Sequence, residues 1–195
     1  MTGLATLCLV ACGSPEILAP RDGTVPAGVN LSGSWQIQAA SARDQRRIRD
    51  AIRKTDGVDD AVALERPSST NSRSGRSRNN GKVRGGLVYV FLELGDALKI
   101  TQTDHGLFVS FDRSVVEEYR FGGSQVVNVG QVQAQRAVGW EGETLIVETL
   151  DRNGMKLTER IRLTENDQVL ERTIILRSRA LEEESVVQRF DRVSD

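Results

Sequence analysis

The chain has 195 residues, enough for one domain and too few for two well-packed ones. Hydrophobic residues make up 38% of it and aromatic residues 5%, which predicts a folded core accompanied by a solvated segment. A net charge of −1 predicts no general attraction to nucleic acid, and the single histidine, His105, argues against a conventional zinc site, which usually needs several His or Cys ligands.

The chain begins with an apolar segment that ends at a cysteine. Residues 4–11, LATLCLVA, are too few to cross a bilayer and have the length of the hydrophobic region of a signal peptide. The sequence Leu9-Val10-Ala11-Cys12 resembles the lipobox of bacterial lipoproteins. This resemblance implies that residues 1–11 are a signal peptide and that Cys12 is lipidated, with residues 12–30 as a lipidated tether. The alternative is a buried amino-terminal strand or helix that contains two ordinary cysteines.

The lipoprotein resemblance also implies a location in the bacterial cell envelope, with acyl chains such as palmitate in the membrane. Cys8 leaves with the signal peptide and Cys12 is alkylated, so the mature domain has no free thiol and no disulfide. In envelopes that sort lipoproteins by the residue after the cysteine, aspartate favours retention in the inner membrane. Residue 13 is glycine, so we expect the periplasmic face of the outer membrane.

A first strand and an insert follow the tether. Residues 31–38 predict a turn that leads into the strand. Ser41-Ala42-Arg43-Asp44 has the pattern of a capping box, and Ile48, Ala51 and Ile52 follow it at helical spacing, so a surface helix ending near Gly57 is predicted.

The rest of the insert, which spans about 41–84, is basic and polar. Residues 43–84 hold twelve Lys/Arg against six Asp/Glu. Residues 66–84 are mainly Ser, Asn, Gly and Arg, with almost nothing to bury, which predicts a disordered Arg/Ser-rich loop. Contact between this loop and an anionic envelope surface is the alternative to simple solvation. The apolar residues of 87–94 suit both a helix and a strand, and we favour a short buried helix.

From residue 97 onwards the pattern predicts a β-meander. Apolar and polar residues alternate, which is typical of antiparallel strands with one face in water. With the first strand there are about nine strands, and a sheet of that length tends to close on itself. We therefore predict a mainly β fold, an antiparallel up-and-down meander that closes into a barrel of about 8–9 strands, with an open curved sheet capped by the helix as the alternative. The predicted strands cover 98–103, 107–111, 115–121, 132–140, 144–150, 155–163, 169–177 and 185–193.

The head of the first strand carries a short motif. Gly33-Ser34-Trp35 resembles the G-x-W motif of lipocalin-type barrels. The resemblance implies that Trp35 closes the base of the barrel and packs against an arginine of the last strand, for which Arg189 and Arg192 are the candidates. The insert at about 41–84 departs from the lipocalin pattern, and a second lipocalin motif is not evident. Residues 31–195 are thus expected to form a single lipocalin-like domain.

Two charged residues fall on predicted inward faces. Alternate residues of a strand face the same side. Arg136 therefore faces the same side as Val138 and Trp140, and Glu159 the same side as Leu157 and Ile161, which we call having the same strand parity. A charge on an inward face must be paired or must meet a ligand. We therefore hypothesise that both lie in the barrel interior with Trp35, or contact a ligand there. The alternative is an internal ion pair, or a bulge that turns one of them outward.

The sequence predicts a non-enzymatic protein without a cofactor. His105 lies with Asp104 in a predicted hairpin turn, which offers neither an enclosed site nor an orienting carboxylate. The leading hypothesis is an envelope lipoprotein that binds a small apolar ligand or lipid in its barrel. The alternative is an outer-membrane scaffold or assembly factor that uses its surface and basic insert. An apolar cavity of a few hundred Å³ would favour ligand binding, and an interior filled by side chains would favour the scaffold.

Overall fold

The structure is a computed structural model that describes residues 16–56, 88–113 and 115–193. Three of the predicted features lie outside the described residues: the signal peptide at 1–11, the lipidation site at Cys12 and the disordered loop at 66–84.

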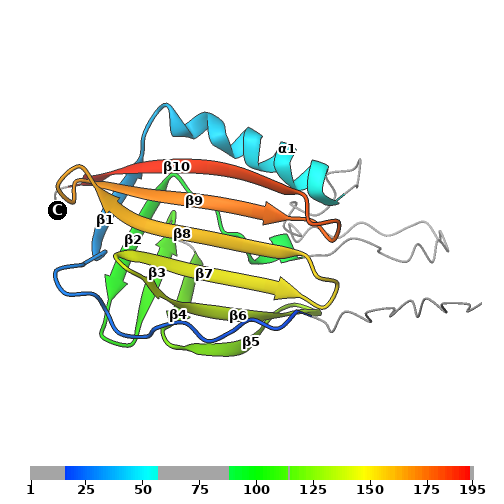
Figure 1. Ribbon diagram of the computed structural model, residues 1–195. Helices are drawn as coiled ribbons and strands as arrows, with labels where there is room; N and C mark the ends of the chain where they lie inside the picture. The colour runs from blue at the N-terminus through cyan, green and yellow to red at the C-terminus, as the bar shows by residue number, and fades with distance from the viewer. Residues whose placement is uncertain (1–15, 57–87, 114, 194–195) are drawn as a thin grey trace, which may run out of the picture.

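Ten strands form one antiparallel sheet in the order β4-β3-β2-β1-β10-β9-β8-β7-β6-β5 (Figure 1). Apart from the pairing of β1 with β10, every strand pairs with a neighbour in the chain, as in an up-and-down meander. The strands are β1 Gly33–Ile37, β2 Ala97–Gln102, β3 Gly106–Phe111, β4 Val115–Arg120, β5 Gly123–Val129, β6 Val132–Glu141, β7 Thr144–Asp151, β8 Lys156–Thr164, β9 Val169–Arg177 and β10 Glu183–Val193. The helices are η1 Ser41–Arg43, α1 Asp44–Asp56 and η3 Val88–Phe91.

The sheet curls until its two edges, β4 and β5, come together at the turn that joins them. The Gly122 N–H in this turn donates to the Val138 carbonyl of β6 at 2.9 Å. Further along, Arg136 of β6 donates to Glu117 of β4 at 3.0 Å. Among the described residues no backbone ladder joins β4 to β5, so the barrel has a seam there. The predicted mainly β meander with one α-helix is confirmed.

The strand that the sequence pattern did not predict is β5, which raises the count from about nine to ten. Val126 is 59% exposed and Val129 is 41% exposed. Neither face of this strand is buried, so the apolar residues show no alternation from which a strand could be inferred.

The predicted helix is present, but its start differs from the expected capping box. The Ser41 hydroxyl accepts a hydrogen bond from the backbone N–H of Arg189 on β10 at 3.1 Å and so ties η1 to the sheet. The capping-box prediction was therefore wrong, because a tertiary partner takes the hydroxyl. Helix α1 runs along β10, with Ile48 and Ala51 buried. Residues 87–94 contain the short helix η3, as favoured over a strand.

The barrel has two different ends. The closed end carries the loops 103–105, 121–122, 142–143 and 165–168 (Figure 1). The lid end carries the loops 130–131, 152–155 and 178–182, together with the carboxyl end of α1. At the lid end the side chains of α1 and η3 pack into one cluster with those of β8, β9 and β10, consisting of Ile48, Ala51, Tyr89, Leu92, Met155, Leu157, Ile174, Leu176 and Val186.

A strap, residues 16–25, lies across the outside of β6 and β7 (Figure 1). Leu18 packs against Ala137 and Leu150, and the Trp140 N–H donates to the Asp22 carbonyl at 2.8 Å. A Cβ on Gly139 would lie 2.3 Å from that carbonyl oxygen, so only glycine leaves room for the strap. Of the predicted tether at 12–30, the part from residue 16 onwards thus packs on the barrel.

Candidate ligand site inside the barrel

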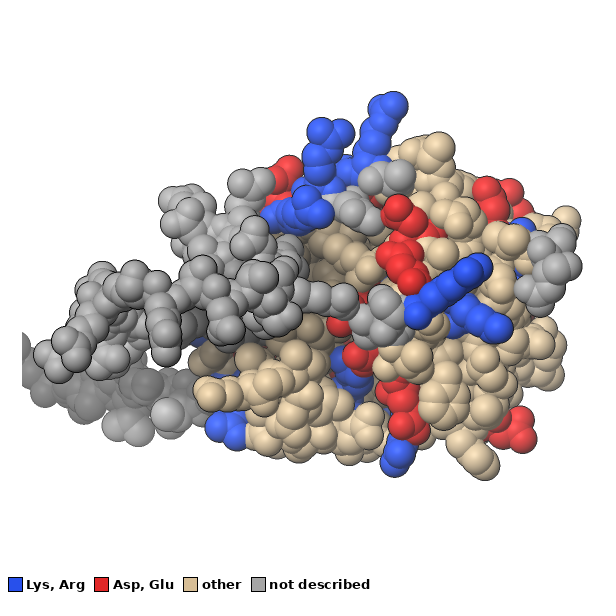
Figure 2. Space-filling view, turned by 180° about the vertical axis from the view of Figure 1, so that it is seen from behind, with Lys and Arg blue, Asp and Glu red and all other residues tan. Residues whose placement is uncertain are grey.

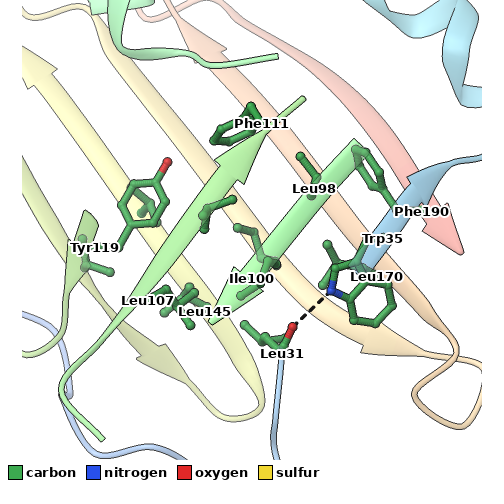
Figure 3. Close-up of a cluster of buried hydrophobic side chains, with 14 of the residues drawn as sticks. Leu31, Trp35, Leu98, Ile100, Leu107, Phe111, Tyr119, Leu145, Leu170 and Phe190 are labelled. Atoms are coloured by element: carbon green, nitrogen blue, oxygen red, sulfur yellow. Dashed lines mark hydrogen bonds between the residues drawn. The ribbon is translucent and has the colours of Figure 1, made fainter. Parts of the chain in front are cut away.

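Trp35 fills the closed end of the barrel. Its side chain is 1% exposed, and its indole N–H donates to the Leu31 carbonyl at 3.1 Å (Figure 3). Of the two candidate arginines on the last strand, Arg192 is the one that stacks on the ring, with its guanidinium carbon 4.2 Å from the ring centroid. The Arg192 guanidinium also donates to the carbonyls of Ser32 and Asp167, so it joins three segments at this end.

The packing of Arg192 on Trp35 also requires a glycine at position 33. Its φ is +147°, and a Cβ at this position would lie 2.7 Å from Nη1 of Arg192. Glycine therefore provides both the backbone conformation and the space over which the arginine lies. The G-x-W sequence and Arg192 form one packing unit.

Polar residues form a belt around the middle of the otherwise apolar interior. They lie on the inward faces of consecutive strands from β10 to β6 and, across the seam, on β4. All but Glu117 are at most 3% exposed. We call these residues the polar belt: Gln188, Arg172, Glu159, Thr149, Arg136 and Glu117.

Glu159 is paired with Arg172 in the belt. Nε of Arg172 donates to the Glu159 carboxylate at 2.7 Å, and Nη2 donates to the Glu93 carbonyl at 2.9 Å. The guanidinium lies over the ring of Phe111, 5.3 Å from its centroid. Both charged side chains are almost fully buried, at 2% and 3% exposure, so the pair is removed from water and relies on these contacts.

Arg136 lies beside the seam and is paired with Glu117 rather than with Glu159. It donates to the Glu117 carboxylate at 3.0 Å and to the Thr149 hydroxyl at 3.3 Å. Its guanidinium lies over the rings of Phe91 and Tyr119 at 5.6 and 5.3 Å. Burial and the negative charge of Glu159 raise the pKa of Tyr119, so its hydroxyl stays protonated at neutral pH.

The side-chain amide of Gln188 has a nitrogen without a partner among the described residues. Its Oε1 accepts from Arg172 at 3.4 Å, but its Nε2 has no hydrogen-bond partner within the part of the chain that the structure describes. The side chain is fully buried. A buried donor without an acceptor is costly to a folded protein, and this one is aimed into the barrel.

The structure places Trp35, Arg136 and Glu159 inside the barrel and supplies partners that the sequence analysis missed. Arg172 has the strand parity of Leu170 and Ile174, and Gln188 that of Phe190. The alternation that singled out Arg136 and Glu159 would have found both. It could not have shown which inward-facing residues pair with one another, because that depends on how neighbouring strands are aligned.

The interior around the belt is filled by side chains. Leu107, Leu145, Leu157 and Gln188 are all 0% exposed, so no water-sized space lies against them. The two described pockets are on the outside. One, of about 490 Å³, lies near the lid end between Val126, Leu150 and Asn153, and the other, of about 350 Å³, lies at the closed end beside His105 and Phe108.

The described residues do not form a metal site or a membrane-spanning helix. No group of three or more His, Cys, Asp or Glu is suitably placed to hold an ion within the described ranges. No helix in the same ranges is long and apolar enough to span a bilayer. His105 lies exposed in the loop between β2 and β3. In the view of Figure 2, acidic and basic side chains lie close together over much of the described surface, so this face carries no extended patch of one sign.

Three carboxylates hold the strap against the barrel. Burial alone would raise the pKa of Glu16, but hydrogen bonds and charges from Arg177 and Lys156 outweigh it, so the pKa lies below its ordinary value. The hydrogen bond from Arg21 likewise holds the pKa of Glu141 below its ordinary value. Arg21 also donates to Glu148 at 3.0 Å.

We expect the strap to loosen in acid before the barrel unfolds. A pKa that is lower in the folded than in the unfolded state stabilises the folded state above the ordinary value of 4.5. That contribution is lost as the pH falls through the lowered values. Hydrogen exchange, corrected for its intrinsic pH dependence, should accelerate at 16–24 in this window while β8 and β9 stay protected. In a Glu16→Gln/Glu141→Gln variant the acceleration should be smaller, and an unchanged pH profile would contradict this explanation.

The chain matches no protein-family model, and no curated protein matches it in sequence. Three solved structures are similar. A secretory abundant heat soluble protein from Ramazzottius varieornatus is 10% identical, with 90% of this chain and 100% of that chain covered and a TM-score of 0.48. Secretory abundant heat soluble protein 4 of the same organism is 13% identical (84% and 94% covered, TM-score 0.46), and a point mutant of the fluorescent protein UnaG is 14% identical (85% and 97% covered, TM-score 0.40). These similarities assign no function, which has to be inferred from the residues of the chain.

Proposed function

We propose that this protein is a non-enzymatic envelope lipoprotein whose barrel binds one small, mainly apolar ligand or lipid. The observation that carries the proposal is the polar belt. A barrel that only had to be stable would gain little from it, because well-packed apolar residues in place of a buried ion pair are often neutral or stabilising. Four charges in an apolar interior and an amide nitrogen without a partner among the described residues are therefore better explained by recognition of a ligand than by a contribution to stability.

The belt also indicates the chemistry of the ligand. It contains two arginines and two glutamates, so it is neutral overall and the charges satisfy one another. Within the belt, the donor that is left over is Nε2 of Gln188. A ligand that fits this arrangement has an apolar body and one uncharged hydrogen-bond acceptor, such as an ester or amide carbonyl. Because the interior is filled, the ligand must displace side chains of the lid-end cluster as it enters.

Native mass spectrometry of the protein purified in mild detergent from its own host tests this proposal. We expect a co-purified molecule with the mass of a small lipid. Gln188→Leu should lose that molecule several-fold more readily and should cost little stability, because the change removes an unsatisfied buried donor and only one long hydrogen bond, from Arg172. Gln168→Leu, at an exposed glutamine of the β8–β9 turn, is the matched control. A ligand-free wild-type protein would count against binding in the barrel.

The lipid anchor rests on the lipobox at residues 9–12. We expect Cys12→Ala to abolish lipidation and to release the protein from membranes, because the lipid on this cysteine is the proposed anchor. Mass spectrometry and membrane fractionation measure both effects. A Cys12→Ala variant that still pellets with membranes, at an unchanged mass, would disprove the assignment. Gly13 after the cysteine favours the periplasmic face of the outer membrane.

The second candidate, a scaffold or assembly factor, is favoured by the filled interior and by the sheet edges. The edge strands β4 and β5 expose Val116, Val126 and Val129 at 66%, 59% and 41%. Exposed apolar residues on an unpaired edge are where another chain can add a strand. Under this hypothesis no small molecule co-purifies, and crosslinking in cells joins β4 or β5 to one partner protein.

A further inference from the structure

We propose that the lid end of the barrel faces the membrane and lies against its headgroups, so that ligand is exchanged directly with the bilayer. This inference rests on the proposed function, because it takes Cys12 as the anchor. The orientation follows from where the strap is attached to the barrel. It makes the lid end the surface that contacts the membrane, which a lipid anchor alone would not define.

The strap fixes the start of the described chain at the lid end. Glu16 forms ion pairs with Lys156, at the start of β8, and with Arg177, at the end of β9. Both residues border lid-end loops. Leu18, two residues later, is 4% exposed and packs on the outside of β6 and β7. From there the strap runs to the closed end, where Gly23 lies against Gly122.

The distance from the anchor to this attachment is short. Glu16 is the fourth residue after Cys12, and a fully extended chain spans at most about 3.6 Å per residue, or about 14 Å over these four steps. The barrel is longer than this, because the eight residues of β7 alone rise by about 26 Å. With an anchor of this length the barrel cannot stand upright on its closed end without detaching the strap.

The end that is brought to the bilayer is the one that can open. The lid-end cluster closes it with side chains of α1 and η3, among them Ile48 and Tyr89. The closed end, by contrast, is held by Trp35 and by the three-segment contacts of Arg192. A lipid that leaves the membrane thus meets the end of the barrel that side-chain movement can open.

Two single-cysteine variants at opposite ends of β7 test the orientation. Glu143→Cys lies in the β6–β7 loop at the closed end, and Asn153→Cys lies in the β7–β8 loop at the lid end. Both positions are exposed, and the mature, lipidated chain has no other free thiol. Each variant carries a small fluorophore and is reconstituted, with its lipid, in phosphatidylcholine/phosphatidylglycerol vesicles that contain a headgroup-attached nitroxide quencher. We expect the label at Asn153→Cys to be quenched several-fold more strongly.

A linker control tests whether the short tether is the cause. Twenty Gly/Ser residues inserted between Ser14 and Pro15 add about 25 Å of average reach, and we expect them to abolish the difference between the two labels. A difference that survives the linker overturns the tether explanation. Equal quenching in a protein whose mass shows the lipid overturns the orientation alone, whereas an unmodified Cys12 overturns the orientation together with the proposed lipoprotein.

Discussion

Replacing Trp35 with alanine is expected to lower the free energy of unfolding by about 3–5 kcal/mol, the usual cost of removing a large aromatic side chain from a core. The ring is 1% exposed and contacts the core that β1, β2, β9 and β10 share (Figure 3). Its removal also leaves Arg192 without the ring on which it stacks and the Leu31 carbonyl without its donor. The loss is therefore a cavity together with two broken polar contacts.

Denaturant unfolding measures this loss, and the second tryptophan, Trp140, remains as a fluorescent reporter in the variant. Phe108→Ala is the matched control, because this aromatic residue is 43% exposed on β3. It should cost about 1–2 kcal/mol, since a large part of its area stays in water in the folded protein and its removal leaves no enclosed cavity. A Trp35→Ala variant that is no less stable than Phe108→Ala would show that the ring does not close the barrel.

The sequence predicted the strands whose two faces differ in burial. In β8 the inward-facing Leu157, Glu159 and Ile161 alternate with Thr158 and Arg160, and this pattern alone identified both the strand and its inner face. The same rule located the interior side of β6 and β9. It works because one face meets the core and the other meets water.

The sequence could not predict features that depend on a partner distant in the chain. The outer face of β6 is buried at Ala137 by the strap, which has no regular secondary structure and hence no period to detect. Ser41 is followed by a helix, as a capping residue would be, yet its hydroxyl is taken by β10. The pairing of Glu159 with Arg172 is similar, because parity gives the face of a residue and not its neighbour across the sheet.

The second large effect is expected at the Glu159–Arg172 pair. Replacing either residue alone with leucine should cost about 3–5 kcal/mol, because it leaves the other charge buried without its partner. Replacing both should cost less than the sum of the two single changes, since the double variant leaves neither charge in the interior. The three unfolding free energies, with the wild type, give the coupling energy.

An outward-facing pair on the same two strands is the matched control. Arg162 donates to Glu171 at 2.9 Å, but Arg162 is 55% exposed and Glu171 has a second partner in Arg189. Its coupling energy should be below about 1 kcal/mol, because Arg162 is largely in water and the buried Glu171 keeps Arg189 as a partner when Arg162 is removed. Equal coupling energies for the inner pair and the outer pair would contradict the argument that burial makes the inner pair depend strongly on both partners.

The double variant also separates stability from ligand binding. If Glu159 and Arg172 serve recognition, Glu159→Leu/Arg172→Leu should stay folded and should be purified without the molecule that accompanies the wild type. Replacing Arg172 removes the guanidinium that donates to Oε1 of Gln188, so the amide that faces the ligand is no longer held in place and binding is lost although the core remains packed. A folded double variant that retains the ligand would show that this pair is structural, and recognition would then have to rest on Gln188 and Arg136 at other points of the belt.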